Sequence, residues 1–279
     1  MIQDIYPHKL YNQFDPNAKV CSDSRIISFD HQYVLLCIED GVHIPTFEEA
    51  REKLNVEENQ LRFLFYVDEI AYFLVDTIEH PEKAYEYIDL RNVRGHKELE
   101  KYHRYAIMTA KHLSDWYRDV KFCGRCGRPM IPSRTERAMV CPECNYTAYP
   151  RIMPAVIVGV KNGDKILLTK YRVGFRYNAL IAGFVEIGET LEETVAREVM
   201  EEAGLRVKNI RYYKSQPWGI ANDILTGFYC DVDGDDTITM DETELKYAEW
   251  VAREDIILQP DNSSLTNEMM MMFKEGIEK

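Results

Sequence analysis

One stretch constrains this chain more than any other: residues 183–205, which read GFVEIGETLEETVAREVMEEAGL. Its spacing is G-x5-E-x7-R-E-U-x-E-E-x-G-U, where U is a bulky aliphatic residue. Thr190, followed three residues later by Glu193, predicts a capping box that opens a helix. Gly204 predicts the left-handed end of that helix. An apolar stripe at a spacing of four would hold the helix on a sheet, and it consists of Leu191, Val195 and Val199.

The carboxylates of this helix lie on another face. Glu198, Glu201 and Glu202 occupy positions i, i+3 and i+4, so we expect them to converge. Like charges crowded in this way repel one another unless a cation lies among them, and hard oxygen ligands suit Mg²⁺ or Mn²⁺, which also bind phosphate oxygens. The alternative is a solvated acidic helix face, the usual explanation for a glutamate-rich helix. The intact pattern around these residues favours a site for pyrophosphate chemistry.

The complete stretch resembles the Nudix box. This resemblance implies hydrolysis of a nucleoside diphosphate linked to another group. Arg197 lies between the capping turn and the glutamates, and we expect it to orient the glutamate cluster rather than to touch substrate.

A second strong pattern lies upstream of the box. Four cysteines have the spacing C-x2-C-x14-C-x2-C, with glycine in and after the first pair and proline in the second. Thiolates two residues apart can each cover one side of a tetrahedral Zn²⁺, and two such knuckles close its coordination shell, so we predict a structural zinc. Two disulfides are the alternative, but nothing marks the chain as secreted. The predicted ligands are Cys123, Cys126, Cys141 and Cys144.

Composition narrows the class of partners. The 34 basic and 47 acidic side chains leave a net charge of −13, which would repel a nucleic-acid backbone over most of the surface and confine any RNA contact to the mouth of the active site. No apolar run approaches the length of a membrane span, and the N-terminus lacks the pattern of a secretory signal. Together with an odd number of cysteines, these features predict a cytoplasmic protein without membrane contact.

The chain divides into four expected parts within the α+β class. We predict an N-terminal α/β domain, a linking helix, a zinc ribbon, and a C-terminal Nudix fold in which helices sandwich a mixed sheet. Their respective ranges are residues 1–95, 96–119, 120–148 and 149–279.

Two smaller expectations concern local structure. Residues 61–67 and 70–75 predict a hairpin in the first domain, and residues 155–160 and 165–169 predict another hairpin across Asn162-Gly163-Asp164. The acidic residues at 231, 233, 235 and 242 partly fit a calcium-loop template. Asp236 stands where that template requires glycine, so we interpret them as an acidic hairpin loop.

The order of parts resembles the NADH pyrophosphatase (NAD diphosphatase) family. The likeness covers about residues 116–251 and rests on the FCGRCG and CPEC knuckles, the YPR that follows them, and the box. That family also carries the specificity motif SQPWPFPxS. Here Ser215 to Asp223 read SQPWGIAND, so the SQPW half is intact whereas the Pro-Phe-Pro half and the final serine are replaced.

The resemblance implies hydrolysis of NADH or NAD⁺ to the nicotinamide mononucleotide and AMP, and in some members removal of an NAD cap from RNA. It places the Mg²⁺ or Mn²⁺ ligands at Glu198, Glu202 and Glu244, with Glu201 as an additional candidate. Glu201, Glu202 and Glu244 each remain conceivable as the general base. The implied substrate contacts are Phe184 by stacking, Tyr149 from the partner subunit of a homodimer, the backbone of Ala182, and the segment Gln216, Pro217 and Trp218.

Two other functions remain open. One is a Nudix hydrolase that prefers ADP-ribose, diadenosine polyphosphates or a sugar nucleotide, because the specificity motif is incomplete. The other is a non-catalytic regulator that senses a nucleotide or binds nucleic acid. The complete set of carboxylates and the acidic balance of the chain disfavour the second.

Overall fold

The computed structural model describes residues 1–39, 41–172 and 177–278. Its contacts divide the chain into two compact units. The N-terminal unit comprises Ile2–Arg151 and Gly219–Asn222, and the C-terminal unit comprises Met1, Ile152–Trp218 and Asp223–Lys279. No helix among the described residues is long and apolar enough to span a membrane.

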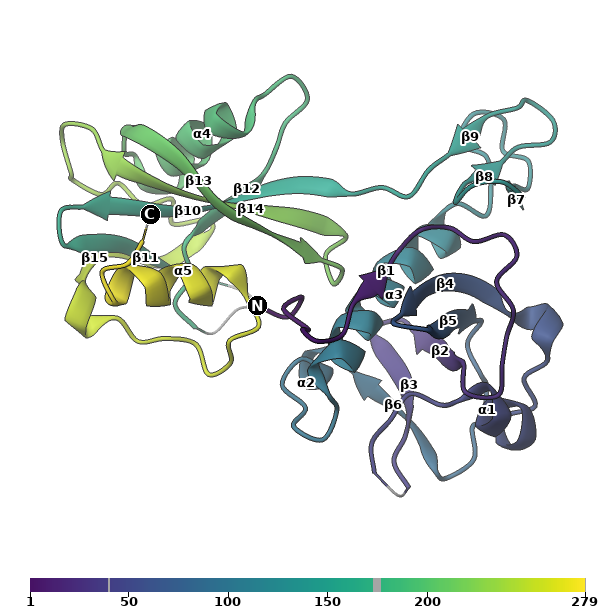
Figure 1. Ribbon diagram of the computed structural model, residues 1–279. Coiled ribbons are helices and arrows are strands. Elements are labelled where there is room, and N and C mark those ends of the chain that lie inside the picture. Colours follow the sequence, from purple (N-terminus) through teal and green to yellow (C-terminus); the bar gives the residue numbers. More distant parts are fainter. Residues whose placement is uncertain (40, 173–176, 279) are drawn as a thin grey trace. The chain divides into compact units, whose positions relative to one another are not determined.

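The N-terminal unit is built on a six-stranded sheet of order β1-β4-β5-β2-β3-β6, in which only β2 and β5 run parallel (Figure 1). The predicted hairpin of residues 61–67 and 70–75 is confirmed, because β4 and β5 pair antiparallel across Asp68-Glu69. The strands are β1 (Leu10–Tyr11), β2 (Arg25–Asp30), β3 (Tyr33–Cys37), β4 (Arg62–Val67), β5 (Ile70–Val75) and β6 (Tyr85–Asp89).

Helices cover both faces of this sheet. The core on one face includes Ile107 and Leu113 of the long helix α3, and the core on the other face includes Phe47 and Ala50 of α1. The helical segments are α1 (Phe47–Lys53), η1 (Glu58–Gln60), α2 (Leu90–Val93) and α3 (Lys101–Asp119).

Helix α3 is shorter than the sequence predicts. The predicted helix begins at residue 96, whereas α3 begins at Lys101. Leu99 is buried in the core, and Glu100 occupies the N-cap position with an extended ψ of 150°. The chain therefore reaches the core through an irregular segment before the helix starts.

A small three-stranded sheet follows α3 within the N-terminal unit (Figure 1). Its strands are β7 (Ile131–Pro132), β8 (Met139–Val140) and β9 (Thr147–Ala148). Cys123 and Cys141 pack into the same core as α3, so the cysteine cluster and the long helix share one apolar interior.

The C-terminal unit is a mixed sheet of order β13-β14-β10-β11-β15, with β12 paired to the first half of β10. Only β10 and β14 run parallel among these pairs. The predicted hairpin across Asn162-Gly163-Asp164 is confirmed by the pairing of Asn162 with Lys165. The strands are β10 (Met153–Asn162), β11 (Lys165–Tyr171), β12 (Ile181–Phe184), β13 (Val207–Trp218), β14 (Asp223–Val232) and β15 (Leu245–Ala252).

Helix α4 (Leu191–Ala203) packs on one face of this sheet and helix α5 (Leu265–Lys274) on the other (Figure 1). A short 3₁₀ turn, η2 (Arg253–Asp255), follows β15. This mixed sheet between helices confirms the predicted fold class. Met269, Met270 and Phe273 on α5 are fully buried and belong to the core on this face.

The acidic segment after β14 is not a hairpin loop, which corrects the prediction. The strand that follows it, β15, pairs with β11 rather than with β14. Both edges of β14 are already occupied, by β10 on one side and β13 on the other. The acidic segment therefore connects two strands that are not neighbours in the sheet.

Candidate active site and cysteine cluster

Helix α4 is held in place by its own ends and by its apolar stripe. Thr190 accepts a hydrogen bond from the N–H of Glu193, while the Glu193 carboxylate accepts from the N–H of Thr190, which is the predicted capping box. Gly204 ends the helix at φ 70° in the left-handed region, as predicted. Val195 and Val199 are fully buried against the sheet. With both ends and one face fixed, the carboxylate-bearing face has a defined direction.

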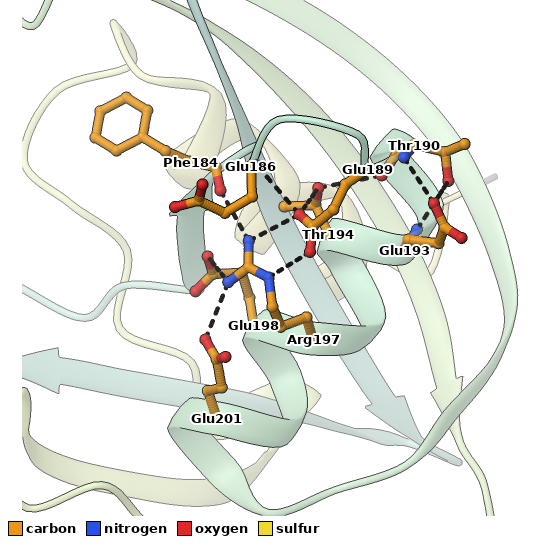
Figure 2. A network of polar contacts seen from close by, with 9 residues as sticks. All are labelled: Phe184, Glu186, Glu189, Thr190, Glu193, Thr194, Arg197, Glu198 and Glu201. Carbon is orange, nitrogen blue, oxygen red and sulfur yellow. Dashed lines mark hydrogen bonds and ion pairs between the residues drawn. The ribbon is translucent and has the colours of Figure 1, made fainter.

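Arg197 is the centre of a polar network at the start of this face (Figure 2). Its guanidinium donates to both oxygens of Glu189, at 2.7 and 3.0 Å. The same group donates to Glu198 at 2.7 Å and to Glu201 at 3.0 Å. A further hydrogen bond of 2.9 Å reaches the carbonyl oxygen of Phe184. One planar cation thus ties the helix, the turn before it and the end of β12 together.

The carboxylate of Glu198 lies directly over Gly183. A Cβ atom at Gly183 would stand 2.0 Å from the carboxyl carbon of Glu198, which no real contact allows. Only glycine therefore leaves room for this carboxylate between helix and strand. Burial raises the pKa of Glu198, whereas the hydrogen bond from Arg197 lowers it.

Glu202 is the most deeply buried acid of the helix, with 3% of its surface exposed. One carboxylate oxygen accepts a 3.4 Å hydrogen bond from the N–H of Ala182. The other, Oε2, is buried and has no hydrogen-bond partner among the described residues. Burial raises the pKa of Glu202 to about 8, and the charges of Glu198 and Glu244 add to the rise. A buried acid that lacks a partner is unfavourable unless a cation or ligand completes it.

Tertiary structure brings Glu244 to this cluster on the loop between β14 and β15, which contacts the end of α4 through the hydrogen bond from the N–H of Asp241 to the carbonyl of Glu202. Glu244 is exposed, directly precedes β15, and its charge raises the pKa of both Glu198 and Glu202. The carbonyl oxygen of Glu244 accepts a 3.0 Å hydrogen bond from the N–H of Arg172, which anchors the loop.

Tyr171 is a residue of this site that the sequence analysis did not identify. It ends β11, opposite Leu245 of β15. Burial raises its pKa, and the charges of Glu202, Glu244 and Glu198 raise it further, so its hydroxyl group lies within their field. In the sequence, a tyrosine at the end of a strand that lies beside an active site looks the same as a tyrosine that only packs in the core.

The four predicted zinc ligands converge in the N-terminal unit. The Sγ atoms of Cys123, Cys126, Cys141 and Cys144 all lie within 4.8 Å of one another. Cys123 and Cys144 are 3.6 Å apart and Cys126 and Cys141 are 3.5 Å apart, so these thiols are not disulfide-bonded. Four thiolates at ~2.3 Å from a tetrahedral Zn²⁺ stand nearly 4 Å apart, so the cluster fits the ion.

Each knuckle is formed by the same local turn. The N–H of Gly127 donates to the carbonyl of Cys123, and the N–H of Asn145 donates to the carbonyl of Cys141. Gly127 at φ 72° and Asn145 at φ 56° both adopt the left-handed region that glycine and asparagine tolerate. The two halves of the cluster are therefore encoded locally.

Comparison with known families agrees with this geometry. Residues 151–271 match the NUDIX domain and residues 118–149 match the NADH pyrophosphatase zinc ribbon domain. The chain combines a zinc ribbon with a Nudix domain.

Curated proteins resemble this chain over a stretch of about 160 residues. The NAD-capped RNA hydrolase NudC of Citrobacter koseri is 45% identical over 161 residues, which are 57% of this chain and 62% of that protein. The protein of the same name from Escherichia coli is 44% identical with the same coverage. The match thus spans about three fifths of these relatives. Among solved structures, a NUDIX hydrolase from Nitrosomonas europaea is similar with a TM-score of 0.48 and 24% identity, covering 56% of this chain and 92% of that one.

The carboxylates of the Nudix domain fit a hard divalent cation. Glu198, Glu202 and Glu244 offer only oxygen atoms, which Mg²⁺ and Mn²⁺ prefer. The partnerless Oε2 of Glu202 and the space that Gly183 leaves for Glu198 are the features that such an ion would use. Glu201 is 58% exposed at its side chain and is paired with Arg197, which places it at the rim.

Phe184 and Trp218, two of the expected substrate contacts, lie toward the α5 face of the Nudix sheet. Register places Phe184 of β12 opposite Ala155 of β10, and Ala155 opposite Leu225 of β14, which packs in the α5-side core. Trp218 follows one row further along, opposite Asp223. Gly183 faces α4 instead, because neighbouring residues of a strand alternate. Phe184 is 51% exposed, which leaves its ring accessible.

The other expected contacts lie in different surroundings. The Gln216 amide donates to the carbonyl of Ser263 and accepts from the N–H of Leu265, so this side chain holds β13 to the start of α5. Strand alternation directs Pro217 to the opposite face from Trp218. The backbone N–H of Ala182 donates a hydrogen bond to the Glu202 carboxylate. Tyr149 lies in the N-terminal unit, and its hydroxyl group donates to Glu136 at 3.2 Å.

Another group of metal-ligand residue types lies in the N-terminal unit. The ligand atoms of Cys37, His43 and Glu49 are within 4.8 Å of one another. The His43 ring, however, already contacts Glu49 at 2.9 Å and the carbonyl of Gly41 at 3.0 Å. Glu49 is also the reciprocal partner in the capping box of α1, with Thr46. These local bonds account for the grouping.

Proposed function

We propose that this protein hydrolyses the pyrophosphate bond of NADH and NAD⁺ to give the nicotinamide mononucleotide and AMP. The observation that carries the proposal is the buried, partnerless oxygen of Glu202, which lies within the field of Glu198 and Glu244 in a Nudix domain. The adjoining NADH pyrophosphatase zinc ribbon and the relatives named as NAD-capped RNA hydrolases favour a nicotinamide dinucleotide, free or at an RNA end.

Glu198, Glu202 and Glu244 would hold the divalent ion, Mg²⁺ or Mn²⁺. When bound, such an ion neutralises phosphate charge and lowers the pKa of a bound water. Arg197 donates hydrogen bonds to Glu198 and Glu201 and so fixes the direction of both carboxylates. Gly183 of β12 leaves the room in which the Glu198 carboxylate lies. One carboxylate accepts the proton of the attacking water. The candidates are Glu201 at the rim, Glu244 on the loop before β15, and the buried Glu202.

Substrate positioning follows from the two faces of β12. Gly183 lies under the Glu198 carboxylate, while the ring of the next residue, Phe184, projects from the other face. A dinucleotide whose pyrophosphate reaches the glutamates and whose base stacks on Phe184 therefore passes the end of β12. We further propose a homodimer in which Tyr149 of the partner subunit covers the stacked base.

Two features extend the proposal beyond the reaction. None of the seven cysteines is disulfide-bonded, which suits the reducing conditions of the cytoplasm. A net charge of −13 disfavours binding along an RNA backbone, so an NAD-capped RNA would be recognised at its capped end.

A panel of substrates tests the proposal. NADH, NAD⁺, ADP-ribose and NAD-capped RNA are incubated with the purified protein and Mg²⁺ or Mn²⁺, and products are separated by chromatography. We expect AMP with the reduced or oxidised mononucleotide. A protein that cleaves ADP-ribose but neither dinucleotide is instead an ADP-ribose hydrolase, and one that binds these compounds without cleaving any is a sensor.

Trp218 distinguishes the nicotinamide substrate from ADP-ribose. Trp218→Ala removes an aromatic surface worth roughly 0.5 to 1.5 kcal/mol, so kcat/KM for NADH should fall about two- to tenfold. The kcat/KM for ADP-ribose should not change, because ADP-ribose has no nicotinamide ring to stack on Trp218. Trp250→Ala is the control, since Trp250 packs on the α4-side core and should affect both substrates alike. Equal losses with Trp218→Ala would show that Trp218 is also a packing residue.

A further inference from the structure

Asp223 is a buried acid outside the glutamate cluster. It is the first residue of β14, paired with Trp218 of β13 on one side and with Met153 of β10 on the other. Only 5% of its surface is exposed. Its Oδ1 atom is buried and has no hydrogen-bond partner among the described residues. Such an acid is unfavourable in the protein alone, and buried groups left unpaired are frequent at ligand sites.

No protein cation offsets this carboxylate within the described part of the chain. Burial raises the pKa of Asp223 to about 7, and the only opposing contribution is a hydrogen bond from its own backbone N–H. Its strand neighbours Trp218 and Met153 are uncharged. Other charges on the α5 side of the sheet are paired with one another: Glu268 of α5 contacts Lys214 of β13 at 2.6 Å and the N-terminal amino group of Met1 at 3.6 Å.

Strand register places Asp223 beside the proposed ring-binding surface. Side chains directly opposite each other on neighbouring strands have Cβ atoms ~5 Å apart, so Asp223 borders Trp218. The row next to it on the same face runs from Leu225 through the small Ala155 to Phe184. Two strand spacings, ~10 Å, separate the β12 and β14 backbones, a gap that an aromatic ring and an acidic side chain reach across.

We propose that Asp223 makes this site favour the oxidised, cationic nicotinamide ring of NAD⁺, free or at an RNA end, over the neutral ring of NADH. This inference rests on the proposed function and adds to it a preference for one redox form. The related specificity motif ends in serine at this place, whereas aspartate introduces a charge. A carboxylate that no protein cation neutralises acts at full strength on a cation in a poorly solvated site.

The preference has a defined sign with pH. Because burial raises the pKa of Asp223 to about 7, the free acid is mostly neutral at pH 6 and ionised at pH 8.5. The attraction for a cationic ring should therefore grow as pH rises through 7. The metal ligands and the hydrolytic step are common to both substrates, so their own pH dependence cancels in the ratio of kcat/KM for NAD⁺ to that for NADH.

The experiment measures that ratio between pH 6 and 8.5 for the wild type, Asp223→Asn and Asp223→Ser. We expect the wild-type ratio to rise several-fold across this range, and both variants to show a flat ratio about tenfold lower than wild type at pH 8.5, which is ~1.4 kcal/mol. Asp223→Asn keeps the size of the side chain, and melting curves verify that it folds. Asp235→Asn, at an exposed acid of the segment between β14 and β15, serves as the control for a general change in charge.

The outcomes separate the two proposals. Cleavage of both dinucleotides with a ratio that neither variant alters overturns the role of Asp223 and leaves the proposed function standing. A wild type that cleaves neither dinucleotide overturns both. If the variants precipitate, the wild type decides alone, because a ratio that stays flat from pH 6 to 8.5 contradicts a titrating carboxylate beside the ring.

Discussion

The zinc ribbon and the glutamate cluster both bring anionic groups together, but they do so in different ways. The ribbon takes two thiols from each of two turns, and each turn is closed by its own backbone hydrogen bond at Gly127 or Asn145. The glutamate cluster takes ligands from a helix and from a loop more than forty residues later, and it uses Arg197 to hold part of that charge. The ribbon is closed and local, whereas the cluster is open and depends on the tertiary fold.

Because of this difference, we expect the ribbon to contribute to stability and the glutamate cluster to contribute to turnover. A closed set of four thiolates leaves a metal no position for water, so it contributes to stability. The glutamates leave a partnerless oxygen, Oε2 of Glu202, and an exposed Glu244, so they suit an ion that also binds water and phosphate. Substitutions in the ribbon should therefore change stability, and substitutions in the cluster should change turnover.

The largest effect is expected in the ribbon. Cys123→Ser should release the zinc and lower stability by on the order of 4 kcal/mol or more, because Cys123 also lies in the core that includes α3. Turnover per folded molecule should stay within about twofold of wild type at low temperature. Calorimetry and elemental analysis measure this, with the exposed Cys21→Ser as the control. Wild-type protein purified without chelator yet devoid of zinc would refute the closed site.

In the cluster, Glu202→Gln should lower turnover by at least about a hundredfold, the scale of losing a metal ligand or base, without loss of fold. Its melting temperature without divalent ions should equal or exceed that of wild type, because burial makes ionisation of the Glu202 carboxyl group unfavourable. Steady-state kinetics with saturating Mg²⁺ test this. Glu192→Gln, exposed on the first turn of the same helix, is the matched control. Near-normal turnover would contradict the assignment.

Substitution of one glycine in each region allows the glutamate cluster and the ribbon to be compared directly. Gly183→Ala should reduce turnover by about tenfold, because a Cβ would stand 2.0 Å from the Glu198 carboxyl carbon and displace it. Gly124→Ala in the ribbon meets nothing within 4 Å and should leave both zinc content and turnover unchanged. Parallel assays of the two variants, with titration of Mn²⁺, measure the difference. A harmless Gly183→Ala would mean that the Glu198 carboxylate has another place to lie.

The smallest expected effect is a dependence of stability on pH. Hydrogen bonds from Arg197 lower the pKa of Glu189 to about 2, below its ordinary value of 4.5. Its contribution is therefore present above pH 4.5 and lost as pH falls toward 2. Glu189→Gln should show a slightly smaller drop in melting temperature than wild type between pH 5 and 2, with Glu192→Gln again as the control. Superimposable curves would show that the Arg197 network does not contribute to stability.

Part of this protein follows from the sequence alone. The capped ends of α4, the apolar stripe with Val195 and Val199, and the two cysteine knuckles depend on residues within a few positions of one another, so spacing and residue type predict them. The β4–β5 and β10–β11 hairpins were predictable for the same reason. The roles assigned to individual site residues remain predictions, although the structure places Arg197 on the glutamates as expected.

Tertiary structure decided what depends on distant segments. The pairing of β15 with β11 rather than β14 joins residues more than seventy positions apart. The approach of Tyr171 and Glu244 to Glu202 joins residues more than thirty positions apart. The buried carboxyl group of Asp223 likewise follows from the strands on both sides of it. Burial and electrostatic fields are properties of the packed sheet, whereas helix caps and cysteine turns need only the local chain, and this is why the sequence predicted the latter and not the former.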